Sequence, residues 1–253
     1  MTELLALPII GLAFVALFCR EVIAPASRNR CDRRWLLLAS VSGFATVVVM
    51  LVAGYLFSTA IRDAALFDAG AWLSDPMVGL LSFLLNSFVF YWWHRLTHKS
   101  DLLWRVVHQL HHSARRVEAL TAFYAHPLES AAAICMSGCV SYLILGASPT
   151  AAAIALLLTG LFDLFLHSDV RTPRWLGFII QRPEMHTVHH QLDHHAQNYG
   201  LPIWDLLFGT WTNPRERSMI LGFDGDKSDR ITDMLLCRDV HRADPKPDTL
   251  ETP

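Results

Sequence analysis

Residues 35–61 read WLLLASVSGFATVVVMLVAGYLFSTAI and contain no charged side chain. A helix of about 20 apolar residues crosses the hydrocarbon core of a bilayer, so this run is long enough to span a membrane. Four shorter apolar runs occupy residues 4–19, 77–93, 131–147 and 150–166, and Asp163 is the one acid inside them. This pattern predicts an all-α, multi-pass transmembrane protein with about five spans.

The composition agrees with a membrane protein and excludes several other classes. Apolar residues make up 53% of the chain and charged residues only 17%, which is too little charge to cover an ordinary soluble surface. The formal net charge of -2 provides no broad cationic field, so nucleic acid is not expected as a partner. The five cysteines form no C-x-x-C pair, which argues against a disulfide framework and against a thiolate metal site.

The charges between the apolar runs predict how the spans are oriented. Residues 20–34 carry five arginines, whereas residues 61–76 carry one arginine and three aspartates. Because cytoplasmic loops are rich in Lys and Arg, the first loop is expected inside and the second outside. Residues 146–150 read GASPT, a helix-breaking sequence that predicts a tight hairpin between the last two runs. With this alternation, the chain after the third and fifth runs forms a cytosolic helical cap on one face of the membrane.

Histidine is the most unusual feature of the sequence. None of the 13 histidines precedes residue 94, and 12 of them lie between residues 94 and 195. They form three clusters, HRLTH at residues 94–98, HQLHH at 108–112 and HTVHH at 186–190. Residues three or four apart share a helical face, so each cluster is expected to aim two or three imidazoles at one point. The candidate metal ligands of these clusters are His94, His98, His108, His111, His112, His186, His189 and His190.

This number of imidazoles predicts a site for two metal ions. One divalent first-row ion takes about four to six ligands, fewer than the three clusters supply. Imidazole suits iron, zinc and copper alike, so the residue types leave the metal open. The acids near the clusters follow no Glu-x-x-His pattern, so carboxylates are not expected to offset the charge of the two ions. Such a centre would be strongly oxidising, which favours oxygen activation over hydrolysis.

Isolated histidines have weaker claims to the site. His126 and His167 each lie at the mouth of a predicted span, at the same depth as His94, and are therefore further candidate ligands. His194 and His195 lie in a polar stretch, where a supporting or surface role is expected. His241 is expected to have no role in metal binding.

The chain resembles the fatty acid hydroxylase and sterol desaturase superfamily over residues 90–211. The matching motifs follow one another in order and spacing: YWWHRLTH at 91–98, LWR at 103–105, HQLHHS at 108–113, AHPLE at 125–129, FLH at 165–167, HTVHH at 186–190, NYG at 198–200 and WDLLFGTW at 204–211. The one departure is Leu206, where the family usually has arginine.

The resemblance implies an integral-membrane, non-haem di-iron oxygenase with cytosolic histidine boxes. Its cofactors would be two iron ions, with zinc as an alternative occupant after purification, and O2 would be the co-substrate. Its reaction would hydroxylate or desaturate a C–H bond of a sterol, a fatty acyl chain or a lipid headgroup. The resemblance implies the ligand role for the eight clustered histidines and His167, with His126 as a further ligand, and no catalytic residue is expected beyond these ligands.

The sequence contains no dinucleotide fingerprint, flavin motif or cysteine cluster, so a separate ferredoxin- or cytochrome-type protein is expected to donate electrons. We expect residues 1–76 to form N-terminal transmembrane helices, residues 77–240 the catalytic domain and residues 241–253 a disordered tail. The membrane would be the inner membrane of a bacterium or the endoplasmic reticulum of a eukaryote.

The alternative function is a membrane transporter or sensor for zinc or iron. A transporter places its ionisable ligands near the bilayer midplane, whereas these histidines lie at or beyond the ends of the spans. Asn86 and Asp163 are the polar candidates inside the spans, and neither is expected to pair with a histidine there. The sequence therefore favours the oxygenase.

Overall fold

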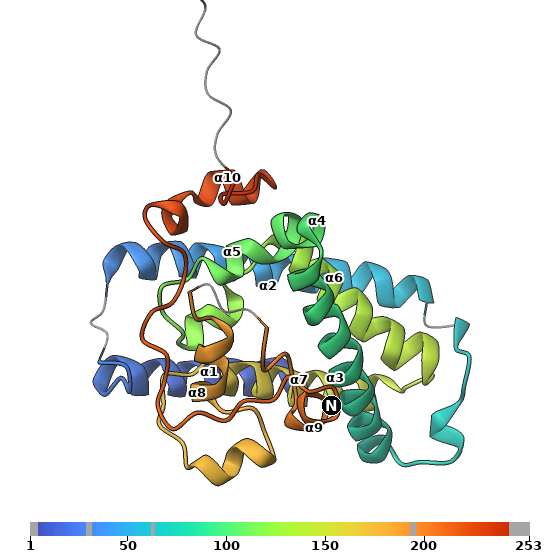
Figure 1. Ribbon diagram of the computed structural model, residues 1–253. Helices are drawn as coiled ribbons and strands as arrows, with labels where there is room; N and C mark the ends of the chain where they lie inside the picture. The colour runs from blue at the N-terminus through green and yellow to red at the C-terminus, as the bar shows by residue number, and fades with distance from the viewer. Residues whose placement is uncertain (1–4, 29–31, 62–63, 193–195, 243–253) are drawn as a thin grey trace, which may run out of the picture.

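The structure is a computed structural model that describes residues 5–28, 32–61, 64–192 and 196–242. Within these ranges the chain is helical, and strand-like pairing is limited to an isolated bridge between Gln191 and Leu221. The prediction of an all-α protein is confirmed for this part of the chain (Figure 1). His194, His195 and residues 243–253 of the expected tail lie outside the described residues.

Five helices are long and apolar enough to cross a membrane, which confirms the predicted multi-pass architecture. They are α1 (Ala6–Ile23), α2 (Arg33–Ile61), α3 (Asp75–Lys99), α6 (Pro127–Gly138) with its π-helical continuation η6 (Cys139–Ile144), and α7 (Pro149–Leu166). Proline in the first turn helps to begin α3, α6 and α7, because backbone N–H groups of that turn have no acceptor within the helix and the missing N–H of proline costs no hydrogen bond. The third apolar run ends at residue 93, but α3 continues to Lys99 and so carries His94 and His98.

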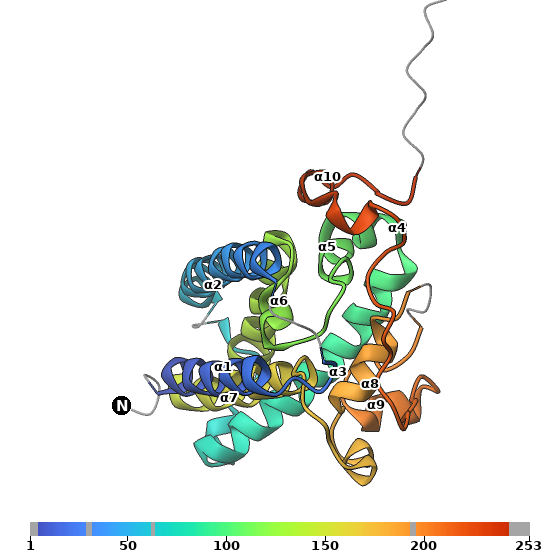
Figure 2. The same ribbon diagram turned by 90° about the vertical axis from the view of Figure 1, so that its left-hand side faces the viewer.

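Three helix pairs form the membrane part: α3 packs against α7, α2 against α6, and α1 against α7. The first pair is close because Gly79 of α3 lies against α7, where an added Cβ atom would stand 2.7 Å from Cβ of Ile154. Two buried serines also join α3 to η6, since Oγ of Ser82 and Oγ of Ser141 lie 2.7 Å apart. In both ribbon views α7 runs beside α1 (Figures 1 and 2).

The ends of the spanning helices alternate as the charge pattern predicts. At one end, the N–H of Leu66 after α2 donates to the carbonyl of Leu143 in η6 (2.7 Å), so the α2–α3 and α6–α7 connections lie together. At the other end, Nε1 of Trp35 in α2 donates to Glu118 of the cap (2.5 Å). The described histidines all lie at this second end.

The cap consists of short helices in two stretches of chain. Before α6 these are α4 (Asp101–Leu103), the π-helical turn η4 (Trp104–His108), α5 (Gln109–His112) and η5 (Ala119–Phe123). After α7 they are η7 (Arg174–Phe178), α8 (Pro183–His189), α9 (Pro202–Leu207), η8 (Lys227–Asp229) and α10 (Ile231–Leu235). A single-turn helix, η3 (Ala69–Ala71), lies at the opposite end of the spans, between α2 and α3.

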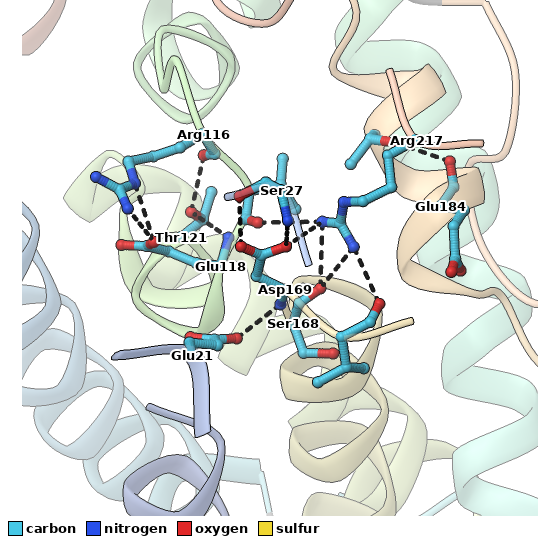
Figure 3. Close-up of polar contacts among 12 residues, drawn as sticks. Glu21, Ser27, Arg116, Glu118, Thr121, Ser168, Asp169, Glu184 and Arg217 are labelled. Atoms are coloured by element: carbon cyan, nitrogen blue, oxygen red, sulfur yellow. Dashed lines mark hydrogen bonds and ion pairs between the residues drawn. The ribbon is translucent and has the colours of Figure 1, made fainter. Parts of the chain in front are cut away.

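A buried polar joint fixes the cap to the first span (Figure 3). The Glu21 carboxylate at the end of α1 accepts hydrogen bonds from the N–H of Asp169 (2.7 Å) and of Ala119 (3.0 Å). The Asp169 carboxylate accepts from the N–H of Ser27 (2.9 Å) and lies 3.5 Å from the guanidinium of Arg217. Because this joint holds the chain directly after α7, it also fixes the position of the histidine that ends that helix.

The close contact at Gly79 yields a stability prediction. Gly79→Ala should destabilise the fold by about 1–3 kcal/mol, because the new methyl group meets both the Ile154 side chain and the Ala151 carbonyl. Gly11→Ala is the matched control in another spanning helix, where an added Cβ has no neighbour within 4 Å. Thermal denaturation in detergent should give a lower midpoint for Gly79→Ala alone, and equal midpoints would contradict the α3–α7 packing.

Candidate metal centre

The structure brings nine predicted ligands into two groups whose nitrogens lie within 4.8 Å of one another in each group. Group one contains His94 and His98 of α3, His108 of η4, His112 of α5 and His189 of α8. Group two contains His111 of α5, His167 at the end of α7, His186 of α8 and His190 at the end of α8. All members of group two are buried, and in group one His94 and His98 are partly exposed.

The sequence clusters do not each converge on one point, so that expectation is wrong. His108 and His112 share group one, while His111 between them belongs to group two. Likewise, His186 and His190 share group two, while His189 belongs to group one. The reason is helical geometry: residues four apart differ by about 40° around the axis, whereas consecutive residues differ by about 100°. Each H-x-x-H-H cluster therefore contributes to both groups.

The two groups adjoin and form one continuous histidine core. His112 of group one stacks on His190 of group two, with ring centroids 4.3 Å apart and planes 16° from parallel. His190 also lies 4.7 Å from His111, measured between ring centroids. This arrangement fits two cations in neighbouring positions that share one buried site.

Backbone carbonyls determine which nitrogen of each ring faces inward in group two. Nδ1 of His111 lies 3.1 Å from the Tyr124 carbonyl oxygen, and Nδ1 of His167 lies 2.9 Å from the Asp163 carbonyl oxygen. A carbonyl oxygen only accepts hydrogen bonds, so both rings carry their proton on Nδ1. The two Nε2 atoms, 3.2 Å apart, then present lone pairs to each other. A cation between these atoms would turn repulsion into coordination.

Burial keeps three rings of group two neutral and therefore available as ligands. It lowers the pKa of His111 to about 3 and holds the pKa values of His186 and His190 well below their ordinary value. Metal ligation requires the neutral imidazole, and at neutral pH these three rings would all be unprotonated on one nitrogen. The donor set of group two thus fits a divalent cation.

Group one shows the same arrangement. Nδ1 of His94 donates to the Tyr199 carbonyl (2.8 Å), and Nδ1 of His189 donates to the Gln197 carbonyl (2.8 Å). Nε2 of His94 is buried and has no hydrogen-bond partner among the described residues. A buried polar atom without a partner is costly, and a bound cation would satisfy it.

Two carboxylates stand directly behind the ligands, which corrects two expectations. Oε1 of Glu129 accepts a hydrogen bond from Nδ1 of His108 (2.5 Å), and Oδ1 of Asp163 lies 3.3 Å from Nδ1 of His167. Nearby carboxylates are therefore placed to offset the charge of two bound ions, and Asp163 does pair with a histidine. The pairing of Asp163 with His167 could have been found in the sequence from their i, i+4 spacing, whereas Glu129 is brought to His108 only by the packing of α6.

His186 differs from the other ligands in its hydrogen bonding. Nε2 of Gln181 donates to the Asn198 carbonyl (2.7 Å) and lies 3.3 Å from Nδ1 of His186, which therefore accepts from this amide. The proton of His186 is then on Nε2, which lies 2.9 Å from Nε2 of His167. Coordination by Nε2 of His186 would displace that proton. Both Gln181 and Asn198 are buried supports of the site, and the sequence alone gave no signal for Gln181.

His126 lies outside both groups. Its Nδ1 accepts from the N–H of Leu128 (3.1 Å), which caps the start of α6, and its Nε2 donates to the Leu235 carbonyl (3.3 Å). Both nitrogens are thus used in hydrogen bonds that connect α6 to α10. His241 is exposed and packs on Phe223, with ring centroids 4.5 Å apart.

The segment after α8 supports the ligands through its backbone. The Asp205 carboxylate accepts from the N–H of Tyr199 (2.9 Å), the N–H of Gly200 (3.2 Å) and the hydroxyl of Thr210 (2.7 Å). These bonds fix the Tyr199 carbonyl that receives His94, and burial raises the pKa of Asp205 to about 6. Leu206 is exposed, so the departure from the family pattern at this position does not touch the metal centre.

Comparison with known proteins agrees with this geometry. Residues 79–210, about half of the chain, match the family model described as fatty acid hydroxylase. The chain belongs to the fatty acid hydroxylase family. The match covers both groups from His94 to His190 and includes Glu129 and the supporting Asp205.

Relatives with assigned activities cover part of the chain. The very-long-chain aldehyde decarbonylase GL1-9 of Oryza sativa subsp. indica is 31% identical over 129 residues, 47% of this chain and 48% of that protein. The sphingolipid C4-hydroxylase sur2 of Schizosaccharomyces pombe is 29% identical over 141 residues, 54% of this chain and 48% of that protein. The alkylglycerol monooxygenase of Homo sapiens is 30% identical over 148 residues, 56% of this chain and 32% of that protein.

The matched region spans about half the length of the rice and yeast proteins and about a third of the human protein. No solved structure gives a significant match to the chain.

Metal analysis tests the two-group arrangement. The purified chain should carry about two metal ions, and His189→Ala and His111→Ala should each lower this content, because they remove a ligand from group one and group two respectively. His126→Ala and His241→Ala should retain both ions, since neither ring belongs to a group. A native chain that binds a single ion after metal loading would contradict the arrangement.

The carboxylate behind His108 yields a second metal prediction. Glu129→Gln should weaken metal binding by about 10–100-fold, because a neutral amide stabilises the metal-bound imidazole less than a carboxylate does. The affinity can be measured by competition with a chelator. Asp101→Asn is the control, since that acid is exposed at the start of α4. Equal affinities for Glu129→Gln and the native chain would show that Glu129 does not support the centre.

Proposed function

We propose that this protein is a membrane-bound, non-haem di-iron oxygenase that hydroxylates a C–H bond of a lipid. The observation that carries the proposal is the pair of adjoining imidazole groups, whose nitrogens lie within 4.8 Å of one another in each group, at the end of five candidate spans. Membership of the fatty acid hydroxylase family supports it. The printed activities of a sphingolipid hydroxylase and an alkylglycerol monooxygenase, both partial relatives, agree with an oxidoreductase acting on lipids.

The residues of the chain would hold and tune the metal pair. When bound, two iron ions would supply the reduction of O2 that allows a C–H bond to be broken. Imidazoles of α3, η4, α5 and α8 and at the end of α7 would hold the ions, and Glu129 and Asp163 would offset their charge. Burial of most of these rings would keep water away from the bound ions, and the site would lie close to the acyl region of the bilayer.

Hydroxylation sets what each turnover consumes. One oxygen atom of O2 enters the C–H bond and the other leaves as water, so each turnover uses two electrons and two protons. Desaturation of the same lipid is the alternative outcome, because it begins with the same hydrogen abstraction. We propose a sterol, a fatty acyl chain or a lipid headgroup as the substrate.

The electrons would come from a separate ferredoxin- or cytochrome-type protein that docks on the cap. We propose the cytoplasmic face for the metal centre, because the end of α1 with Arg20 and the start of α2 with Arg33 and Arg34 lie at the histidine end. The host membrane would be the bacterial inner membrane or the endoplasmic reticulum. Residues 77–240 would form the catalytic unit, which contains all the ligands of both groups.

A metal transporter is not favoured by the position of the ligands. A transporter needs a site near the middle of its spans, reached from either side of the membrane. Here the ligands lie in the cap and at the cap ends of α3 and α7. The two acids of the spans that face a candidate ligand also lie at the cap ends: Asp163 pairs with His167 in the last turn of α7, and Glu129 accepts from His108 in the first turn of α6.

Lipid analysis tests the proposed reaction. Membranes of cells that express the native chain should contain a lipid that is heavier by about 16 Da than its precursor if the reaction is hydroxylation, or lighter by about 2 Da if it is desaturation. The new species should be absent with His189→Ala and present with His241→Ala, which alters a histidine outside both groups. An unchanged lipid profile in cells that supply a reductase and electron donor would contradict the oxygenase proposal.

A further inference from the structure

An apolar surface lies on the cap, outside the five spans. We name it the cap apolar surface and define it by side chains of the η7 segment and of α9 that are 50–67% exposed: Trp175, Phe178, Ile179, Ile203, Leu206 and Leu207. The two elements contact each other, and both ribbon views place α9 beside the yellow-orange η7 (Figures 1 and 2). Large contiguous apolar surfaces of this kind mark sites of interaction with a membrane or a protein.

The sequence of α9 leaves apolar side chains on its outer face and turns its polar group inward. Asp205 is fully buried, where it holds the backbone of the segment that follows α8. Trp204 and Phe208 also turn inward, since both rings pack against Phe88 of α3, with centroids 5.0 and 6.4 Å apart. The outer face of this short helix therefore offers no charged group to water.

The position of α9 along α3 indicates what covers this face. Nε1 of Trp204 donates to Oγ of Ser87 in α3 (2.9 Å). Ser87 precedes the ligand His94 by seven residues, which is about 10 Å along a helix toward the middle of the span. The cap apolar surface thus begins at a level inside the apolar run of a spanning helix, and α9 lies directly beside the exposed Phe88 of that helix.

The η7 part of the surface is held rigidly and carries basic residues at its edge. Nε1 of Trp211 donates to the Gly177 carbonyl (3.1 Å), and its ring packs on Phe178 with centroids 5.1 Å apart. Arg171 shortly before η7 and Arg174 at its start are both exposed. Aromatic and aliphatic side chains bordered by arginine are typical of elements that lie at the boundary between headgroups and acyl chains.

We propose that the cap apolar surface is embedded in the lipid bilayer, at the boundary between headgroups and acyl chains on the histidine side. The occupant of this surface is therefore lipid and not a second copy of the chain, because the surface is continuous with the lipid-facing side of α3. The inference concerns how the cap is seated and does not depend on the reaction that the metal centre performs. It implies that the cap is held at two places: by the polar joint at α1 and by the membrane beside α3.

Hydroxyl-radical footprinting of the native chain in phosphatidylcholine nanodiscs tests the proposal. Each disc should hold one chain, so that a second copy cannot protect the surface. Trp175, Phe178 and Leu207 should be labelled several-fold more slowly than in the peptides obtained from the unfolded chain. Leu236 is the control, since it is 58% exposed directly after α10, which lies on the opposite side of the cap in both ribbon views. Its labelling should remain fast.

Two outcomes would overturn the proposal. If labelling of Trp175 and Phe178, each relative to its rate in the unfolded chain, is slowed no more than that of Leu236, water covers the surface. Protection that occurs in discs with two chains and is lost in discs with one would show that a second copy covers it.

A charge placed on the surface provides an independent test. Leu207→Glu alters an exposed side chain, so the melting temperature in detergent and the metal content should match those of the native chain. In nanodiscs the buried charge should lift α9 out of the acyl region and raise the labelling of the neighbouring Leu206 several-fold. The matched variant Leu236→Glu should leave that labelling unchanged. If both variants leave Leu206 equally labelled, the surface does not lie in lipid.

Discussion

The mutual exposure of imidazole lone pairs is the interaction on which the rest of the structure depends. Nε2 of His111 and Nε2 of His167 lie 3.2 Å apart inside a buried core, and backbone carbonyls hold the proton of each ring on Nδ1. The two lone pairs repel each other unless a cation lies between them. A large part of the fold serves to place these rings and to hold their outer nitrogens.

The spans and the cap cooperate in this placement. The end of α3 supplies His94 and His98, the end of α7 supplies His167, and the π-helical turn η4 with α5 and α8 supplies the others. The buried joint between Glu21 and Asp169 connects α1 to the chain just after His167, so the first span also determines the geometry of group two. This dependence accounts for the burial of Glu21 and Asp169 at the border between the spans and the cap.

Much of the fold and of the site could be predicted from the sequence. Apolar runs predicted the five candidate spans, and helical spacing predicted eight of the nine histidines that come together in the two groups, because both depend on local periodicity. The division of each H-x-x-H-H cluster between two groups was missed, since the sequence does not show that rings approach α5 and α8 from two sides. Glu129 and the carbonyls of Tyr199 and Gln197 reach the ligands through tertiary packing, which one sequence does not reveal. His126 was expected among the ligands from its depth and from the family resemblance, but its Nδ1 caps α6 and its Nε2 donates to the Leu235 carbonyl of α10.

X-ray absorption at the iron edge, on the native chain loaded with iron, tests the central claim most directly. The account predicts nitrogen ligands at about 2.1 Å together with strong outer-shell scattering from several imidazole rings per iron. It also predicts that the nitrogen shell is the same when one ion or both ions are bound, because both groups consist of histidine. A shell dominated by oxygen or sulfur, without imidazole scattering, would contradict the account.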